Sequence, residues 1–125
     1  MSKILIIEDD KFLRELITRK LQSEKFEITS AIDGESGLEL VEKERPDLVL
    51  LDLILPGING FEVLGKIKEN EAIASIPVII LSNLGQKDDI EKGMGLGAVD
   101  YLVKAHFTPN EIIAKINEVL ARTSP

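Results

Sequence analysis

Short apolar runs alternate along this chain with segments that have the spacing of amphipathic helices. Five runs have the length of strands, and they are apolar at successive positions rather than at every second one. Such runs are typical of strands that are buried on both faces, as in a parallel sheet covered by helices. They span residues 4–7, 26–32, 48–51, 78–81 and 99–103.

Helical spacing follows each of these runs. Apolar residues recur there at intervals of three and four, which predicts one helix after each strand. The pattern therefore predicts an α/β protein with a doubly wound, five-stranded parallel sheet, formed by a single domain over residues 1–125 with no output domain. The helix-forming residues are Leu13, Leu16, Ile17 and Leu21; Leu38 and Val41; Val63, Leu64 and Ile67; Ile90 and Met94; and Ile112, Ile113, Ile116 and Leu120.

The last two predicted helices have different boundary signals. The fifth starts with an N-cap, a first-turn proline and a capping-box acid, which are Thr108, Pro109 and Glu111. The fourth has glycine at positions 93, 95 and 97. Because an interior glycine costs about 1 kcal/mol relative to alanine, we expect the fourth helix to end early or to fray.

Polar side chains collect where the predicted strands end. The first strand leads into Glu8, Asp9 and Asp10, the third into Asp52, the fourth into Ser82 and Asn83, and the fifth into Lys104. In an open parallel sheet, ligands bind outside the carboxyl ends of the strands. The sequence thus predicts one site to which four strands contribute.

These residue types suit phosphoryl transfer next to a cation. Glu8, Asp9 and Asp52 would repel one another without a cation, and a small site made of oxygen ligands favours Mg²⁺. Asp52 can then attack phosphorus as a nucleophile while Lys104 stabilises the phosphoryl oxygens. The hydroxyl of Ser82 can bond the phosphoryl group once it has arrived, so the sequence predicts a two-state switch.

Each of these residues also has a simpler interpretation. Asp9 or Asp10 can serve only as the N-cap of the first helix, and Ser82 can be a capping residue. Lys104 can be a solvated surface charge. The joint occurrence of these residues at the ends of four strands nevertheless favours a functional site.

The whole chain resembles the receiver domains of two-component response regulators, specifically the stand-alone, chemotaxis-type members. The resemblance rests on the segments ILIIEDD at 4–10, PDLVLLDLILPGING at 46–60, PVIILS at 77–82 and GAVDYLVK at 97–104. It implies a flavodoxin-like sheet of strand order 2-1-3-4-5. It also implies a histidine kinase or phosphotransfer protein as phosphodonor, and signalling to an unidentified protein through the face of helix four, strand five and helix five.

The resemblance also implies roles for individual residues. Asp52 is implied to be the phosphoacceptor. The implied Mg²⁺ site comprises the acidic pair Glu8 and Asp9, Asp52, and the backbone carbonyl of Ile54. The implied switch and catalytic residues are Ser82, Tyr101 and Lys104.

Several positions qualify these expectations. The family usually has a cis-proline after the lysine, whereas this chain has Ala105, so the sequence leaves the geometry of that peptide open. Asn83 stands where the family has alanine or glycine, and it can crowd the phosphoryl pocket or bond within it. The resemblance implies that Ile54 and Leu84 flank the path of the attacking water, and because neither can hydrogen-bond to it, the sequence predicts slow self-dephosphorylation. We expect His106 to be an exposed loop residue.

Composition excludes several classes of protein. With 22 acidic and 15 basic residues and a net charge of -7, we expect no direct contact with nucleic acid. Cysteine is absent and there is one histidine, which excludes disulfides and multi-histidine metal clusters. No segment resembles a signal peptide or a membrane span, so we expect a cytoplasmic protein.

Three other functions fit the residues less well. A haloacid dehalogenase-type phosphatase needs a second aspartate two positions after the nucleophile, where this chain has Ile54. A flavodoxin-like FMN protein needs a phosphate loop after strand one, where Glu8, Asp9 and Asp10 would repel phosphate. A pseudo-receiver would not need the set Asp52, Ser82 and Lys104. We therefore expect no enzyme beyond a domain that catalyses its own phosphorylation and slow dephosphorylation.

Overall fold

A parallel sheet of five strands forms the centre of the molecule. The computed structural model describes residues 2–123. The strand order is β2-β1-β3-β4-β5, which confirms the predicted 2-1-3-4-5 topology. The strands are β1 (Lys3–Ile7), β2 (Glu27–Ala31), β3 (Leu48–Leu51), β4 (Val78–Ser82) and β5 (Asp100–Val103).

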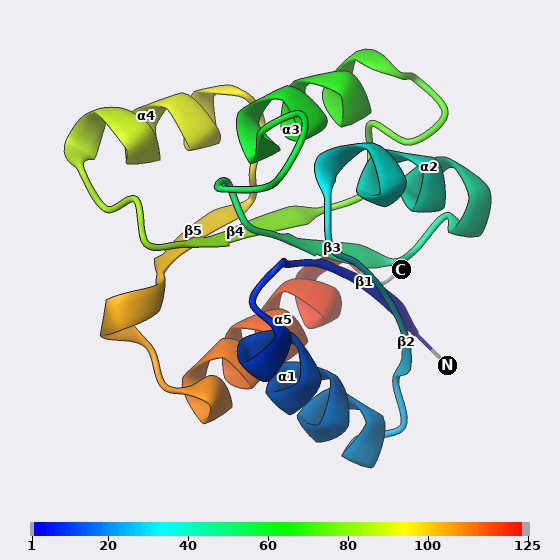
Figure 1. The fold of residues 1–125 in the computed structure, drawn as a ribbon. Helices are drawn as coiled ribbons and strands as arrows, with labels where there is room; N and C mark the ends of the chain where they lie inside the picture. Colours follow the sequence, from blue (N-terminus) through cyan, green and yellow to red (C-terminus); the bar gives the residue numbers. More distant parts are fainter. Residues whose placement is uncertain (1, 124–125) are drawn as a thin grey trace.

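Helices cover both faces of the sheet. In Figure 1, α1 and α5 lie below the sheet, and α2, α3 and α4 lie above it. This is the doubly wound arrangement that the alternating pattern predicts. The helices are α1 (Lys11–Ser23), α2 (Gly34–Glu44), α3 (Gly60–Glu69), α4 (Lys87–Gly95) and α5 (Pro109–Thr123), with a short 3₁₀ helix η1 (Lys104–His106) after β5.

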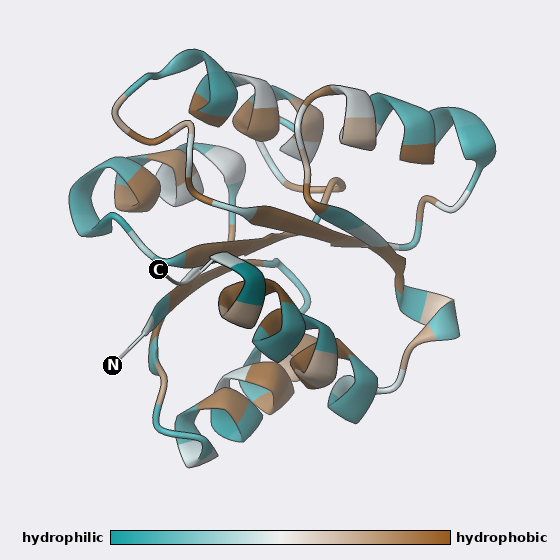
Figure 2. Ribbon diagram, turned by 180° about the vertical axis from the view of Figure 1, so that it is seen from behind, coloured by the Kyte–Doolittle hydropathy of each residue, from teal (hydrophilic) through white to brown (hydrophobic). Residues whose placement is uncertain are grey.

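Successive strand residues point into two separate cores. Ile4 and Ile6 of β1 pack toward α1 and α5, whereas Leu5 and Ile7 pack toward α2 and α3. Figure 2 shows the resulting hydrophobic sheet between helices whose outer surfaces are hydrophilic. The prediction of burial on both faces is correct for β1, β3 and β4 apart from Lys3. It is wrong for β2 and β5, because these edge strands have a neighbour on one side only and keep partly exposed residues.

The ends of the helices follow the sequence signals closely. Glu111 and Thr108 exchange the two hydrogen bonds of a capping box, at 2.9 and 3.2 Å, at the start of α5. The fourth helix stops at Gly95, and Gly97 has a φ of 112°, which side chains rarely adopt. Both predictions are confirmed. Among the described residues, none of the helices combines the length and apolar character needed to cross a membrane.

Candidate functional site

Three polar side chains lie buried at the carboxyl ends of the strands. Among residues 2–123 the buried polar or charged side chains are those of Glu8, Asp52 and Ser82. The parallel register aligns Ile7 with Leu51, which places Glu8 next to Asp52 immediately beyond. Burying such groups is costly unless they are paired, so their position indicates a site rather than ordinary packing.

Lys104 pairs with two of these carboxylates. Its Nζ lies 2.8 Å from Oε1 of Glu8 and 3.1 Å from Oδ2 of Asp52, and its side chain is 16% exposed. The interpretation of Lys104 as a solvated surface charge is therefore wrong. Burial alone would lower the pKa of Lys104, but the hydrogen bond to Glu8 and the charge of Asp52 outweigh it and raise the pKa.

Glu8 lies at the crowded centre of the cluster. Burial raises the pKa of Glu8 to about 7, although the hydrogen bond from Lys104 acts in the opposite direction. The negative charge of Asp52 adds to the increase. Two adjacent carboxylates and one ammonium group thus leave the cluster short of positive charge, which favours a bound cation.

The two oxygens of Asp52 have different surroundings. Oδ1 accepts hydrogen bonds from the backbone N–H groups of Leu53 at 2.7 Å and Ile54 at 3.4 Å. Oδ2 accepts a hydrogen bond from Lys104. Two backbone amides and one ammonium group therefore fix the carboxylate, which is the pre-organisation that a nucleophile requires.

The donor set fits a divalent cation. One carboxylate oxygen from each of Glu8, Asp9 and Asp52 lies within 4.8 Å of the others, and Asp9 is exposed to solvent. Oxygens that are neighbours around one Mg²⁺, bound at about 2.1 Å, lie about 3 Å apart, so the three carboxylates have to move closer together to share the cation. The fold nevertheless brings the predicted acidic set together. The carbonyl of Ile54 as a further ligand stays a prediction.

A short chain of contacts connects Ser82, at the end of β4, with β5. The hydroxyl oxygen of Ser82 accepts a hydrogen bond from the N–H of Leu84 at 3.3 Å. The Tyr101 hydroxyl donates a hydrogen bond to the carbonyl oxygen of Leu84. Burial raises the pKa of Tyr101 to about 12, and the charges of Asp89 and Asp52 add to this effect. Both implied switch residues therefore contact the same backbone segment.

Comparison with known proteins identifies the family. The family model of the response regulator receiver domain matches residues 4–117. The chain belongs to the response regulator receiver family. The chain is thus a phosphorylation-dependent switch domain of two-component signalling, as the sequence predicts.

Relatives of this receiver are transcription regulators. It is 39% identical over 123 residues to the DNA-binding dual master transcriptional regulator RpaA of Synechocystis, covering 98% of this chain and 51% of RpaA. It is 36% identical over 122 residues to the phosphate regulon regulator PhoB of Pseudomonas aeruginosa, covering 98% of this chain and 53% of PhoB. The chain spans about half the length of these curated relatives.

Solved structures agree with the fold and with the site. The receiver domain of Francisella response regulator 1452 has a TM-score of 0.90 at 30% identity, covering 99% of this chain and 100% of that domain. Response regulator Rcp1, solved with Mn²⁺ bound, has a TM-score of 0.86 at 28% identity, covering 100% of this chain and 98% of its own. A receiver with a divalent cation is therefore known on this fold.

The structure also shows how four further positions of this receiver are arranged. Asp10 caps α1 by accepting from the N–H of Leu13 at 3.2 Å, so its simpler interpretation is correct. The Lys104–Ala105 peptide is trans, as are all peptide bonds of the described part of the chain. Asn83 is exposed to solvent rather than buried in the pocket, and His106 is exposed as expected.

One contact of the receiver site has no signal in the sequence. Nη1 of Arg14 donates a hydrogen bond to the backbone carbonyl of Glu8 at 2.9 Å. Arg14 lies one turn into α1, where an arginine is most often a solvated surface residue. Only the fold reveals that its guanidinium group supports the segment between β1 and α1.

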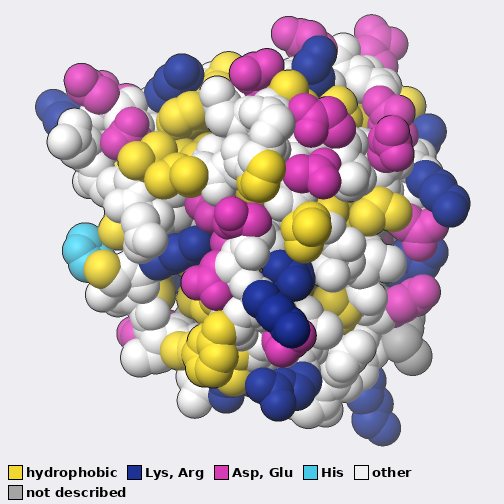
Figure 3. Space-filling view, in the orientation of Figure 1, with side chains coloured by type: hydrophobic (Ala, Val, Ile, Leu, Met, Phe, Trp, Pro, Cys, Tyr) yellow, Lys and Arg dark blue, Asp and Glu magenta, His cyan; other side chains and the backbone are white. Residues whose placement is uncertain are grey.

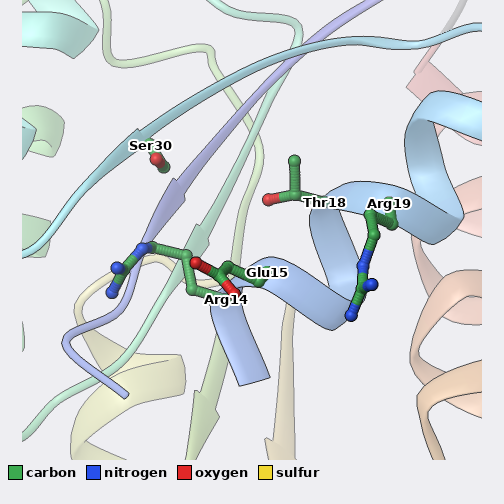
Figure 4. A pocket seen from close by; sticks show the side chains of 5 residues that line it. All are labelled: Arg14, Glu15, Thr18, Arg19 and Ser30. Atoms are coloured by element: carbon green, nitrogen blue, oxygen red, sulfur yellow. The ribbon is translucent and has the colours of Figure 1, made fainter. Parts of the chain in front are cut away.

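A large cavity of the receiver lies between α1 and β2. About 490 Å³ in volume, it is lined by Arg14, Glu15, Thr18, Arg19 and Ser30. Figure 4 shows that the guanidinium groups of Arg14 and Arg19 point away from each other. In Figure 3, acidic and basic side chains instead meet near the middle of the surface, with hydrophobic side chains around them. The residues that line this cavity do not include Glu8, Asp52 or Lys104.

Proposed function

We propose that this receiver accepts a phosphoryl group on Asp52 from a histidine kinase or phosphotransfer protein, with Mg²⁺ at the acidic cluster. The observation that carries the proposal is the environment of Asp52. Its carboxylate is 5% exposed, is held by backbone amides, and lies 3.1 Å from the ammonium group of Lys104. These are the positioning and charge-stabilising groups that phosphoryl transfer needs.

In the proposed transfer, a carboxylate oxygen of Asp52 forms an O–P bond while the P–N bond of a phosphohistidine breaks. The electron pair of the P–N bond stays on the imidazole nitrogen, which takes up a proton from solvent. Lys104, already bonded to Asp52, supplies positive charge next to the arriving oxygens. Mg²⁺ held by Glu8, Asp9, Asp52 and the carbonyl of Ile54 would neutralise the remaining charge.

Phosphorylation would then change the contacts of Ser82. Its hydroxyl lies buried at the end of β4 and now accepts from the N–H of Leu84. A phosphoryl group adds about -1.5 to -2 charge and strong acceptor oxygens, toward which the Ser82 hydroxyl would turn as donor. Because Leu84 also holds the Tyr101 hydroxyl, the change reaches α4 and β5 of the α4–β5–α5 face, where an unidentified protein target would bind.

The same proposal covers the partners of this receiver and the organisation of the protein. The net charge of -7 supports a chain that makes no direct contact with nucleic acid and acts through protein partners. We also propose a stand-alone, chemotaxis-type, cytoplasmic protein that has no catalytic activity beyond its own phosphorylation and dephosphorylation. The similar transcription regulators are about twice as long as this chain. The mass of the native protein in extracts of its source therefore tests whether it is a stand-alone receiver.

We further propose that self-dephosphorylation is slow. The Ile54 side chain is 55% exposed next to Asp52, and Leu84 packs against the core on the α2 and α3 side of the sheet. Neither side chain can orient a water by hydrogen bonding. Asn83 directly follows Ser82 in the sequence, and its exposed polar side chain can hydrogen-bond to water there. Decay of the phosphoprotein after donor removal should be faster in an Ile54→Asn, Leu84→Glu double variant. Equal or slower decay would contradict this proposal.

The direct test is intact-mass spectrometry after incubation with Mg²⁺ and acetyl phosphate. We expect one phosphoryl adduct on the parent protein and none on Asp52→Asn. Asp88→Asn removes an exposed carboxylate of α4 and serves as the control, so it should keep the adduct. An adduct that persists in Asp52→Asn would overturn the proposed function.

A further inference from the structure

The loop between β3 and α3 carries part of the site but extends into solvent. Ile54, Pro56 and Gly57 are exposed, and a hydrogen bond of 2.9 Å from the N–H of Gly60 to the carbonyl of Leu53 closes the base of the loop. Leu55 and Ile58 of the loop pack against the core, whereas Pro56 and Gly57 between them are exposed. The course of the loop backbone, including the Ile54 carbonyl, therefore depends both on this packing and on the contacts that hold the outer part of the loop.

The first turn of α2 holds the loop at two points. Oε1 of Glu35 accepts a hydrogen bond from the N–H of Ile58 at 2.7 Å. The preceding residue, Gly34, donates its N–H to the carbonyl of Pro56 at 3.4 Å, a long and weaker contact. The bond to the Glu35 carboxylate is the short, charge-assisted one, and bonds of this kind are the stronger ones.

The backbone is shaped to admit the Glu35 carboxylate. Gly57 has a φ of 76°, and a Cβ atom there would overlap both carboxylate oxygens of Glu35. On the other side, a Cβ atom at Gly34 would overlap the carbonyl oxygen of Ile58. Glycine at both positions is thus what allows α2 and the loop to approach this closely.

The ordinary role of Glu35 does not account for this arrangement. An acid in the first turn of a helix stabilises the helix by about 0.3–1 kcal/mol through the helix dipole, and Glu35 is exposed. That role needs neither a backbone N–H at 2.7 Å nor a glycine against the carboxylate. The placement of the Glu35 carboxylate against the loop therefore needs another explanation.

We propose that Glu35 is a positioning residue, which holds the β3–α3 loop so that the Ile54 carbonyl lies where a divalent cation binds. The proposal rests on the proposed metal site. Glu35 touches neither the cation nor the phosphoryl group, and it acts only through the N–H of Ile58. Removing a residue that orients a metal ligand typically weakens metal binding by about 10- to 100-fold.

The test is Mn²⁺ titration followed by electron paramagnetic resonance, with a matched set of variants. Glu35→Ala is expected to weaken Mn²⁺ binding by about tenfold, at the lower end of the usual range because Ile54 is one of several ligands. Glu35→Asp keeps the charge but is one methylene too short, so it should weaken binding in the same direction. Glu35→Gln keeps the acceptor oxygen and should restore binding to within about twofold of the parent.

Glu39→Ala is the control, since it removes the same charge one turn further along α2 from an exposed position. It should leave Mn²⁺ binding within about twofold. Equal weakening in Glu35→Ala, Glu35→Gln and Glu39→Ala would show an effect of charge alone and overturn the proposal. Unchanged binding in both Glu35→Ala and Glu35→Asp would overturn it too.

Amide exchange at Ile58 gives a readout that does not depend on metal. Without added cation, exchange of this N–H should be faster in Glu35→Ala than in the parent and unchanged in Glu39→Ala. Equal exchange in all three proteins would show that Glu35 does not hold the β3–α3 loop and would overturn the proposal. If the parent protein binds no Mn²⁺, the proposed function fails, whereas normal metal binding that is insensitive to Glu35 refutes only this inference.

Discussion

The last two helices of the domain are anchored in different ways. Five residues of α5 are buried, and a capping box fixes its first turn. In α4 the only buried residue is Gly93, and its N-cap residue Gln86 makes no side-chain hydrogen bond. Among the described residues, neither core cluster includes a side chain of α4. The fold thus holds α5 firmly and leaves α4 free to move.

What holds α4 instead are contacts with groups near the site. A Cβ atom at Gly93 would lie 2.6 Å from Ile80 and 3.1 Å from the ring of Tyr101, so α4 rests directly on this tyrosine. The ammonium group of Lys92 lies 4.4 Å from the ring centroid of Phe61 on α3. Because Lys92 is exposed, this contact contributes only about 0.5–1 kcal/mol, so α4 can respond to changes at Tyr101 at low cost.

The two helices should differ most in how much stability the protein loses when an apolar side chain is shortened. Ile116→Ala in α5 removes a fully buried side chain and should destabilise the protein by about 2–5 kcal/mol. Ile90→Ala in α4 removes a half-buried one and should cost about 1 kcal/mol. Urea unfolding of the two variants measures this difference. Similar losses would mean that α4 is anchored in the core after all.

A matched pair of glycine variants tests the contact with Tyr101. Gly95→Ala meets no atom within 4 Å and should stabilise α4 by up to about 1 kcal/mol. Gly93→Ala gains the same propensity but overlaps Ile80 and crowds Tyr101, with a cost of about 1–3 kcal/mol. The chain has one tyrosine and no tryptophan, so its fluorescence reports Tyr101 directly. We expect Gly93→Ala to change the tyrosine emission and Gly95→Ala to leave it unchanged. An emission change in Gly95→Ala but not in Gly93→Ala would contradict the contact between α4 and Tyr101.

Helix capping should give the smallest of these effects. Thr108→Ala removes the hydroxyl that accepts from the N–H of Glu111 and should cost about 1 kcal/mol. Gln86→Ala at the corresponding position of α4 removes no capping bond and should change stability by less than about 0.5 kcal/mol. Thermal melting compares the two. A loss in Gln86→Ala as large as that in Thr108→Ala would show a cap on α4 that the structure lacks.

Much of this picture could be predicted because strand ends and helix caps are local signals. Asp52 and Lys104 each follow an apolar run, and the topology of a parallel sheet brings such positions to one edge. The early end of α4 follows from its glycines, and the capping box follows from Thr108 and Glu111. These features depend on residues that are close together in the sequence.

The remaining features depend on packing between distant segments. The contact of Arg14 with the Glu8 carbonyl and that of Glu35 with Ile58 involve side chains without a motif. The exposed position of Asn83 depends on how the segment after β4 turns, and the partial exposure of β2 and β5 depends on which strands form the edges. None of these can be obtained from periodicity or from capping signals.

Hydrogen exchange on the free and phosphorylated protein tests the central claim most directly. If phosphorylation of Asp52 acts through Ser82, Leu84 and Tyr101, exchange should change across residues 83–104, which include α4 and β5. Exchange in α5, residues 109–123, should stay close to that of the free protein because its side chains are fixed in the core. Equal protection of residues 83–104 in both forms would contradict the account.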